Sequence, residues 1–112
     1  MHEMSLAEGV LELIEGSAAA NGFTRVKTVW LEIGALAGVE PEAMRFCFEA
    51  VVKGTVAEGA CLEIIATEGQ GWCQSCDQAV PLRLRYDLCP RCGQAVRATG
   101  GLEMRVKELE VE

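Results

Sequence analysis

Apolar residues in the first twenty positions recur with the period of an amphipathic helix. They stand three or four positions apart, as the inner face of such a helix requires: Leu6, Val10, Leu13, Ile14 and Ala18. Ser5 and Glu8 have the spacing of a capping box, and Asn21-Gly22 offers a left-handed stop. We therefore predict a helix over residues 5–20.

A period of two follows between Arg25 and Ile33 and predicts a strand, with Val29 and Leu31 on one face. Pro41 then stands where proline is favoured, at the first position of a helix. An apolar stripe follows it at helical spacing: Met44, Cys47, Phe48 and Val51. We predict a second helix over residues 41–53.

Two further segments favour strands. Residues 61–67 are rich in β-branched and apolar side chains. Near the end of the chain Leu102, Met104 and Val106 alternate, and after a phase slip the pattern resumes at Leu109 and Val111. These segments supply partners for the strand at 25–33.

Between those segments stand two C-x-x-C pairs, twelve residues apart: Cys73, Cys76, Cys89 and Cys92. Two such turns facing each other across a hairpin form the tetrahedral site of a structural zinc ion, with no position left open for catalysis. Disulfides and a redox-active pair are the alternatives. The spacing favours zinc over both, and Cys47 and Cys61 read as small buried side chains.

The order of elements predicts an α+β fold, in which two helices pack on a small mixed β-sheet and a four-cysteine zinc-binding β-module is inserted. We assign residues 1–68 plus 100–112 to the main domain and residues 69–99 to the insert, which glycines bracket at both ends. Val80, Leu82, Leu84 and Tyr86 are too few to build a core, so the metal must hold this module together.

Charge and composition exclude several classes of function. The formal net charge of −7 opposes binding to nucleic acid, because such affinity comes largely from Lys and Arg. The sequence shows no basic leader and no apolar run of membrane-spanning length, so we expect a cytoplasmic protein without membrane contact. A second histidine, a nucleophile motif and a phosphate-binding glycine loop are all missing, so we do not expect an enzyme.

His2 is the only histidine, and it stands beside the start of the chain. An α-amine, a backbone amide and an imidazole can reach one ion from there, and such strong-field nitrogen donors favour Ni²⁺ or Cu²⁺. A frayed terminus with a solvated histidine is the alternative, and the residue alone does not decide between them.

Several segments together resemble the HypA/HybF family of hydrogenase maturation proteins. They are the opening at residues 1–6, the segment Val29–Gly34, the helix segment Arg45–Glu49, the paired C-x-x-C turns and the closing residues 107–112. The resemblance implies a nickel metallochaperone that carries Ni(II) at Met1, His2 and Glu3 and holds structural Zn(II) on the four cysteines. It also implies that the protein works with a HypB-type GTPase on the large subunit of nickel-iron hydrogenase, or on urease. We expect a monomer or a weak dimer.

Two other functions stay open at this stage. A zinc-ribbon module that binds nucleic acid would share the cysteine spacing, although the acidic composition opposes it. An adaptor that assembles other maturation factors without carrying metal would share the whole pattern.

Overall fold

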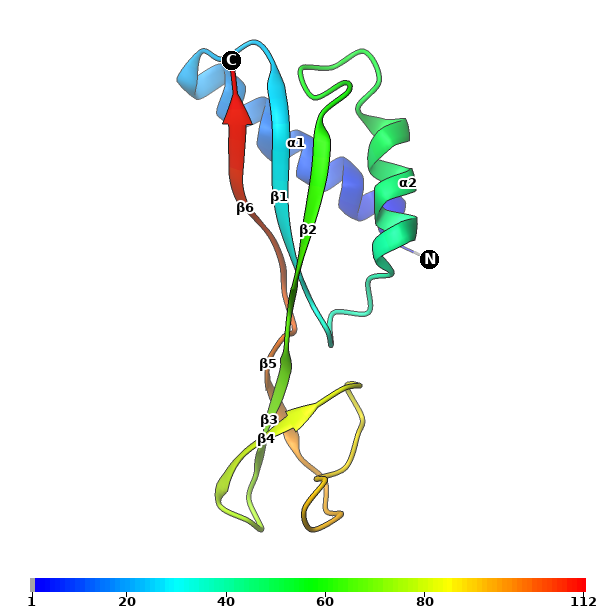
Figure 1. Cartoon of the computed structure of the whole chain (residues 1–112), viewed down its shortest axis with the longest axis vertical. Coiled ribbons are helices and arrows are strands. Elements are labelled where there is room, and N and C mark those ends of the chain that lie inside the picture. Colours follow the sequence, from blue (N-terminus) through cyan, green and yellow to red (C-terminus); the bar gives the residue numbers. More distant parts are fainter. Residues whose placement is uncertain (1) are drawn as a thin grey trace. The chain divides into compact units, whose positions relative to one another are not determined.

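The structure is a computed structural model that describes residues 2–112, and Met1 lies outside the described part. Its elements in chain order are α1 (Glu3–Asn21), β1 (Val26–Gly34), α2 (Pro41–Val51), β2 (Cys61–Thr67), β3 (Gly69–Cys73), β4 (Gln78–Leu82), β5 (Arg97–Gly100) and β6 (Met104–Val111). The strands form two three-stranded sheets, ordered β2-β1-β6 and β4-β3-β5 (Figure 1). The predicted fold class is therefore confirmed, with the second sheet belonging to the cysteine module.

The described chain divides into two compact units. The first contains the residues up to Leu31, Val39–Ile64 and Val106–Glu112, and the second contains Glu32–Gly38 and Ile65–Arg105. The domain boundaries predicted from the glycines, at residues 69 and 99, stay predictions.

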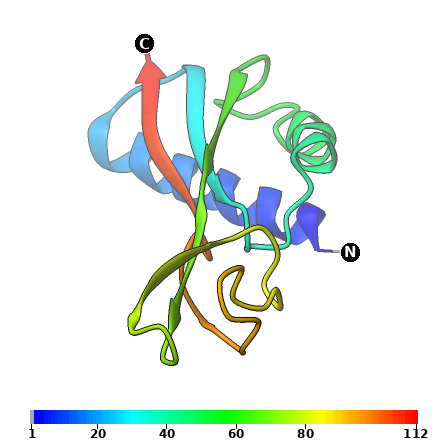
Figure 2. The same cartoon turned by 60° about the horizontal axis from the view of Figure 1, so that its bottom comes forward.

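The first unit contains both helices and most of the core. Figures 1 and 2 show α1 running across one face of the strands that this unit contributes, with α2 beside it. The helices bury one face each, and the buried apolar residues of the unit are Ala7, Val10, Ile14, Ala18, Val26, Val29, Leu31, Met44, Cys47, Phe48, Val52, Ala57 and Leu62. Pro41 opens α2 as predicted, and the Glu40 carboxylate caps it by accepting from the backbone N–H of Ala43 at 2.8 Å.

Helix α1 begins earlier than the capping box predicted. It starts at Glu3, with His2 as a cap residue whose side chain makes no capping hydrogen bond, and Ser5 lies within the first turns. The stop prediction is confirmed, because Gly22 adopts a left-handed φ of 76° and donates its N–H to the carbonyl of Ala18. The start was wrong because the Glu3 side chain is fixed by a residue far along the chain, as described below.

The second unit is built around the short strand β3. It pairs antiparallel with β4 on one side and with β5 on the other. Its small core contains Cys73, Val80 and Cys89, with Cys76 and Val96 packed against them. Strand β4 ends at Leu82, so Leu84 and Tyr86, which continue the alternation in sequence, are exposed in the following loop.

Glycines in the second unit allow a tight crossing of backbone segments. A Cβ on Gly34 would lie 2.1 Å from the carbonyl oxygen of Gly101, and a Cβ on Gly69 would lie 2.4 Å from that of Leu82. Gly101 also has a left-handed φ of 76°. The crossing is hydrogen-bonded, since the Leu36 N–H donates to the Gly101 carbonyl at 2.8 Å. These positions therefore need glycine for close approach.

The two cysteines outside the paired turns differ from each other. Cys47 is buried on α2, as predicted. Cys61 is exposed at the start of β2, which contradicts its prediction as a buried side chain. Its thiol lies 3.2 Å from the carboxylate of Glu63, and this contact raises the pKa of Cys61.

Candidate metal centres

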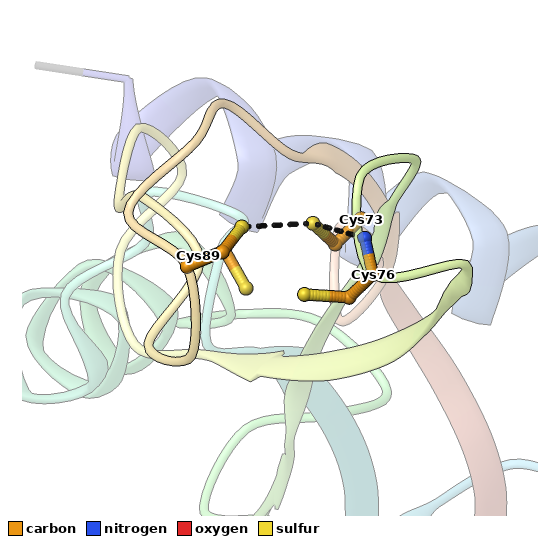
Figure 3. Close-up of side chains that lie close together, drawn as sticks. Cys73, Cys76 and Cys89 are labelled. Atoms are coloured by element: carbon orange, nitrogen blue, oxygen red, sulfur yellow. Dashed lines mark hydrogen bonds between the residues drawn. The ribbon is translucent and has the colours of Figure 1, made fainter.

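The four cysteines of the paired turns come together as the spacing predicted. Cys73 ends β3, Cys76 lies in the turn that leads to β4, and Cys89 and Cys92 lie in the loop before β5. Their sulfur atoms all lie within 4.8 Å of one another. Figure 3 shows the side chains of Cys73, Cys76 and Cys89 pointing toward one another.

This arrangement has the dimensions of a tetrahedral metal site. Four sulfurs that each lie about 2.3 Å from a central ion are about 3.8 Å apart. The Sγ atoms of Cys73 and Cys92 are 3.5 Å apart, and all four cysteines are free thiols. The cluster therefore fits a metal ion bound by four thiolates, and thiolates select soft ions such as zinc.

Backbone geometry prepares both turns for negative sulfur. The Cys76 N–H donates to Cys73 Sγ at 3.4 Å, and the Arg91 N–H donates to Cys89 Sγ at the same distance. Gly93 leaves the second turn with a left-handed φ of 76°. The segment Cys89-Pro-Arg-Cys92-Gly thus has the geometry of a zinc-knuckle turn.

The thiols influence one another's protonation strongly. Hydrogen bonding to Cys92, followed by burial and by bonds to Cys73 and Cys89, raises the pKa of Cys76 to about 12. Burial acts to raise the pKa of Cys89, but hydrogen bonds from the backbone N–H groups of Cys92 and Arg91 and from the thiols of Cys73 and Cys92 together bring it to about 7. Four neighbouring thiols cannot all ionise by themselves, so full ionisation of this cluster needs a bound cation.

The second candidate centre is the start of α1. His2 is exposed, and its carbonyl accepts the first helical hydrogen bond, from the N–H of Leu6 at 3.0 Å. The N–H groups of the first helical residues have no carbonyl partner one turn back, so the amide nitrogens of His2 and Glu3 take no part in the helical ladder. Met1, the third predicted nickel ligand, lies outside the described residues.

Glu3 is a buried charged residue, with an exposed fraction of 5%. Its Oε2 accepts the backbone N–H of Glu40 at 3.1 Å, at the point where α2 begins. That bond, and then a bond from the backbone of Glu3 itself, lower the pKa of its carboxyl group, while burial opposes them. The carboxylate is thus ionised and already occupied by backbone donors.

Sequence reasoning did not find the part played by Glu40. The two residues are 37 positions apart, and nothing in the local pattern around either one signals the contact. The position of Glu40 directly before Pro41 indicated only a helix start.

Comparison with known proteins also indicates a metal-binding protein. Residues 1–111 match the family described as "Hydrogenase/urease nickel incorporation, metallochaperone, hypA". The chain is 59% identical to the hydrogenase maturation factor HypA of Azotobacter chroococcum and 59% identical to that of Dechloromonas aromatica, in each case over the full length of both chains.

The fold has a counterpart among solved structures. The solution structure of the Ni metallochaperone HypA from Helicobacter pylori matches with a TM-score of 0.72 and 27% sequence identity, covering 99% of this chain and 97% of that one. Neither helix in the described residues is long and apolar enough to cross a membrane.

Proposed function

Because the chain belongs to the HypA family of nickel-incorporation metallochaperones for hydrogenase and urease, we propose that it binds Ni(II) at its N-terminus and delivers it during maturation of nickel-iron hydrogenase. Membership of this family confirms the resemblance that the sequence showed. It also confirms that the protein is not an enzyme, since the family consists of metallochaperones. Urease is a second candidate recipient of the metal.

The start of α1 carries this proposal. Nickel is held by the amine of Met1, by backbone nitrogens and by the imidazole of His2. The exposed His2 and amide nitrogens that serve no helical hydrogen bond support such a ligand set. Glu3 contributes its backbone, because its carboxylate is occupied by the N–H of Glu40.

The four-cysteine cluster has a structural role in this proposal. Zn(II) bound by Cys73, Cys76, Cys89 and Cys92 completes the shell and leaves no position for a transported ion. The small core of the unit, which includes two of the cysteines themselves, supports a dependence on metal for folding.

The partners proposed are a HypB-type GTPase and the large subunit of the hydrogenase, in the cytoplasm and without nucleic acid. The family's role in hydrogenase and urease nickel incorporation supports this setting. The net charge of −7 supports the exclusion of nucleic acid.

Calorimetric nickel titration of zinc-loaded protein that begins with a free Met1 tests the proposal. His2→Ala, or residues fused before Met1, should abolish tight nickel binding, because each removes one nitrogen from the chelate. Ser5→Ala, one turn along the same helix, is the matched control and should bind nickel like the parent.

Zinc content measured on the same samples separates the two centres. The His2 variant and the extended protein should both keep their zinc. Nickel affinity that survives both changes would refute the N-terminal site and favour the adaptor function instead.

A further inference from the structure

The loop between β4 and β5 exposes a group of large apolar side chains that the functions above do not use. In the second unit, the exposed fractions of Leu84, Tyr86 and Leu88 are 67%, 89% and 58%. Three exposed large apolar residues thus lie within five positions of one loop. We call Leu84, Tyr86 and Leu88 the apolar loop.

Hydrogen bonds hold this loop in one shape. The Asp87 carboxylate accepts the backbone N–H groups of Arg83 at 3.2 Å and Leu84 at 3.0 Å, and the Asp87 N–H donates to the Leu84 carbonyl at 3.1 Å. A turn closed in this way presents its apolar side chains with little entropy left to lose on binding.

A pocket of about 630 Å³ lies against the same loop. Its apolar lining comes from Pro81, Leu82, Leu88 and Pro90, and its charged lining from Glu68, Arg83 and Asp87. A volume of this order accommodates several aliphatic side chains. Leu88 therefore belongs to both the apolar loop and the lining of the pocket.

Positive charge predominates in the loop itself. Residues 83–91 include Arg83, Arg85 and Arg91, all exposed, against the single acidic residue Asp87. The ion pairs found among residues 2–112 involve none of these three arginines. The Asp87 carboxylate is occupied by backbone donors, so the three guanidinium groups are available to a partner.

We propose that the apolar loop, its pocket and these arginines bind an acidic segment of a partner protein, in which leucine-like anchors are flanked by carboxylates. The anchors fill the pocket and cover Tyr86, and the carboxylates pair with the arginines. Tyrosine and arginine are the residue types most enriched at the energetic centres of such interfaces. This binding site is separate from the nickel centre and does not rest on nickel transport.

A second copy of the chain fits this surface less well. Each copy has a net charge of −7, so an interface between copies brings two acidic molecules together. A short acidic segment meets the arginines without that cost. Nucleic acid would use the arginines and stack a base on Tyr86, but it would leave Leu84 and Leu88 in water.

Tyr86 allows a direct test because it is the only tyrosine of the chain. Zinc-loaded protein labelled with fluorotyrosine should give one fluorine resonance, which reports on the loop alone. Titration with a short peptide carrying two leucines among glutamates should shift it saturably. Replacing the glutamates with lysines, or the leucines with serines, should weaken binding about tenfold or more.

Protein variants locate the site. Arg85→Glu should weaken binding of the glutamate peptide about tenfold or more, whereas Arg97→Glu makes the same charge change on β5 and should stay within about twofold. Each variant must keep the zinc content of the parent. If Arg85→Glu loses metal, Arg85→Gln takes its place.

Several outcomes would overturn the proposal. They are an unmoved resonance, an equal response to the glutamate and lysine peptides, or an equal loss in the Arg85 and Arg97 variants. A resonance that shifts with protein concentration alone would identify a second copy as the occupant. A stronger response to a single-stranded oligonucleotide would identify nucleic acid.

Discussion

The lowered pKa of Glu3 makes the contact between α1 and α2 dependent on pH. A carboxyl group whose pKa is lower in the folded than in the unfolded state stabilises the fold fully above the ordinary value, here 4.5, and less as pH falls through the folded-state value. We predict that Glu3→Ala lowers the urea midpoint at neutral pH and flattens its decline in acid. Urea unfolding across this range is the measurement, and an unchanged acid dependence would contradict the prediction.

Nickel binding separates the two roles of Glu3. If its backbone and not its carboxylate serves the metal, Glu3→Gln should bind nickel within about threefold of the parent, because an amide oxygen can still accept the Glu40 N–H. Glu3→Ala should bind more weakly, since it releases the start of α1. Equal losses in both variants, measured by calorimetry, would assign the carboxylate to the metal.

Protons must leave the cysteine cluster when metal enters. At neutral pH Cys76, with a pKa of about 12, holds its proton without metal, and so does Cys92. The Gln94 backbone lowers the pKa of Cys92, but burial and hydrogen bonds with Cys73 and Cys89 together raise it. We predict release of at least two protons for each zinc bound and loss of zinc in acid. Calorimetry in two buffers of different ionisation enthalpy gives this number, and zero release would mean preformed thiolates.

At the residue scale, local chemistry was predictable and distant contacts were not. The C-x-x-C spacing identified all four cysteines because each pair is a property of one turn. The bond between Glu3 and Glu40 depends on tertiary packing, so the start of α1 was misplaced. The exposure of Cys61 likewise follows from its place at the start of β2 rather than from its apolar neighbours.

At the scale of elements, replacing glycine by alanine should have opposite effects on stability at the glycine crossing and in α1. Gly34→Ala should destabilise the protein by about 1–3 kcal/mol, because its Cβ meets the backbone of Gly101. Gly9→Ala should stabilise it by about 0.5–1 kcal/mol, since a Cβ there meets nothing within 4 Å. Urea unfolding of both variants checks the pair, and a neutral Gly34→Ala would mean that the crossing relaxes.

Periodicity predicted most elements to within two residues. β1 and α2 follow their patterns, because one face of each is buried. The alternation from Val80 to Tyr86 is instead divided by the Asp87 turn, so β4 ends at Leu82 and the remainder becomes the apolar loop. A carboxylate that accepts backbone N–H groups can end a strand that the hydrophobic pattern would continue.

For the whole molecule, the two tryptophans report on the two units separately. Trp30 lies in the β1 segment of the first unit and Trp72 in β3 of the second. Removing zinc with a chelator should alter Trp72 emission, measured in Trp30→Phe protein, because we propose that the metal holds the small core of that unit together. Trp30 emission, measured in Trp72→Phe protein, should stay unchanged. Parallel changes in both would mean that the units unfold together.

The discontinuous make-up of the units also bears on how the protein folds as it is synthesised. The first unit includes residues 106–112, which are synthesised after all four cysteines. The cysteine turns can therefore capture their ion while the helical unit still lacks its final strand. The helical unit is then completed after the cysteine turns, so the order of synthesis favours a cysteine module that forms first.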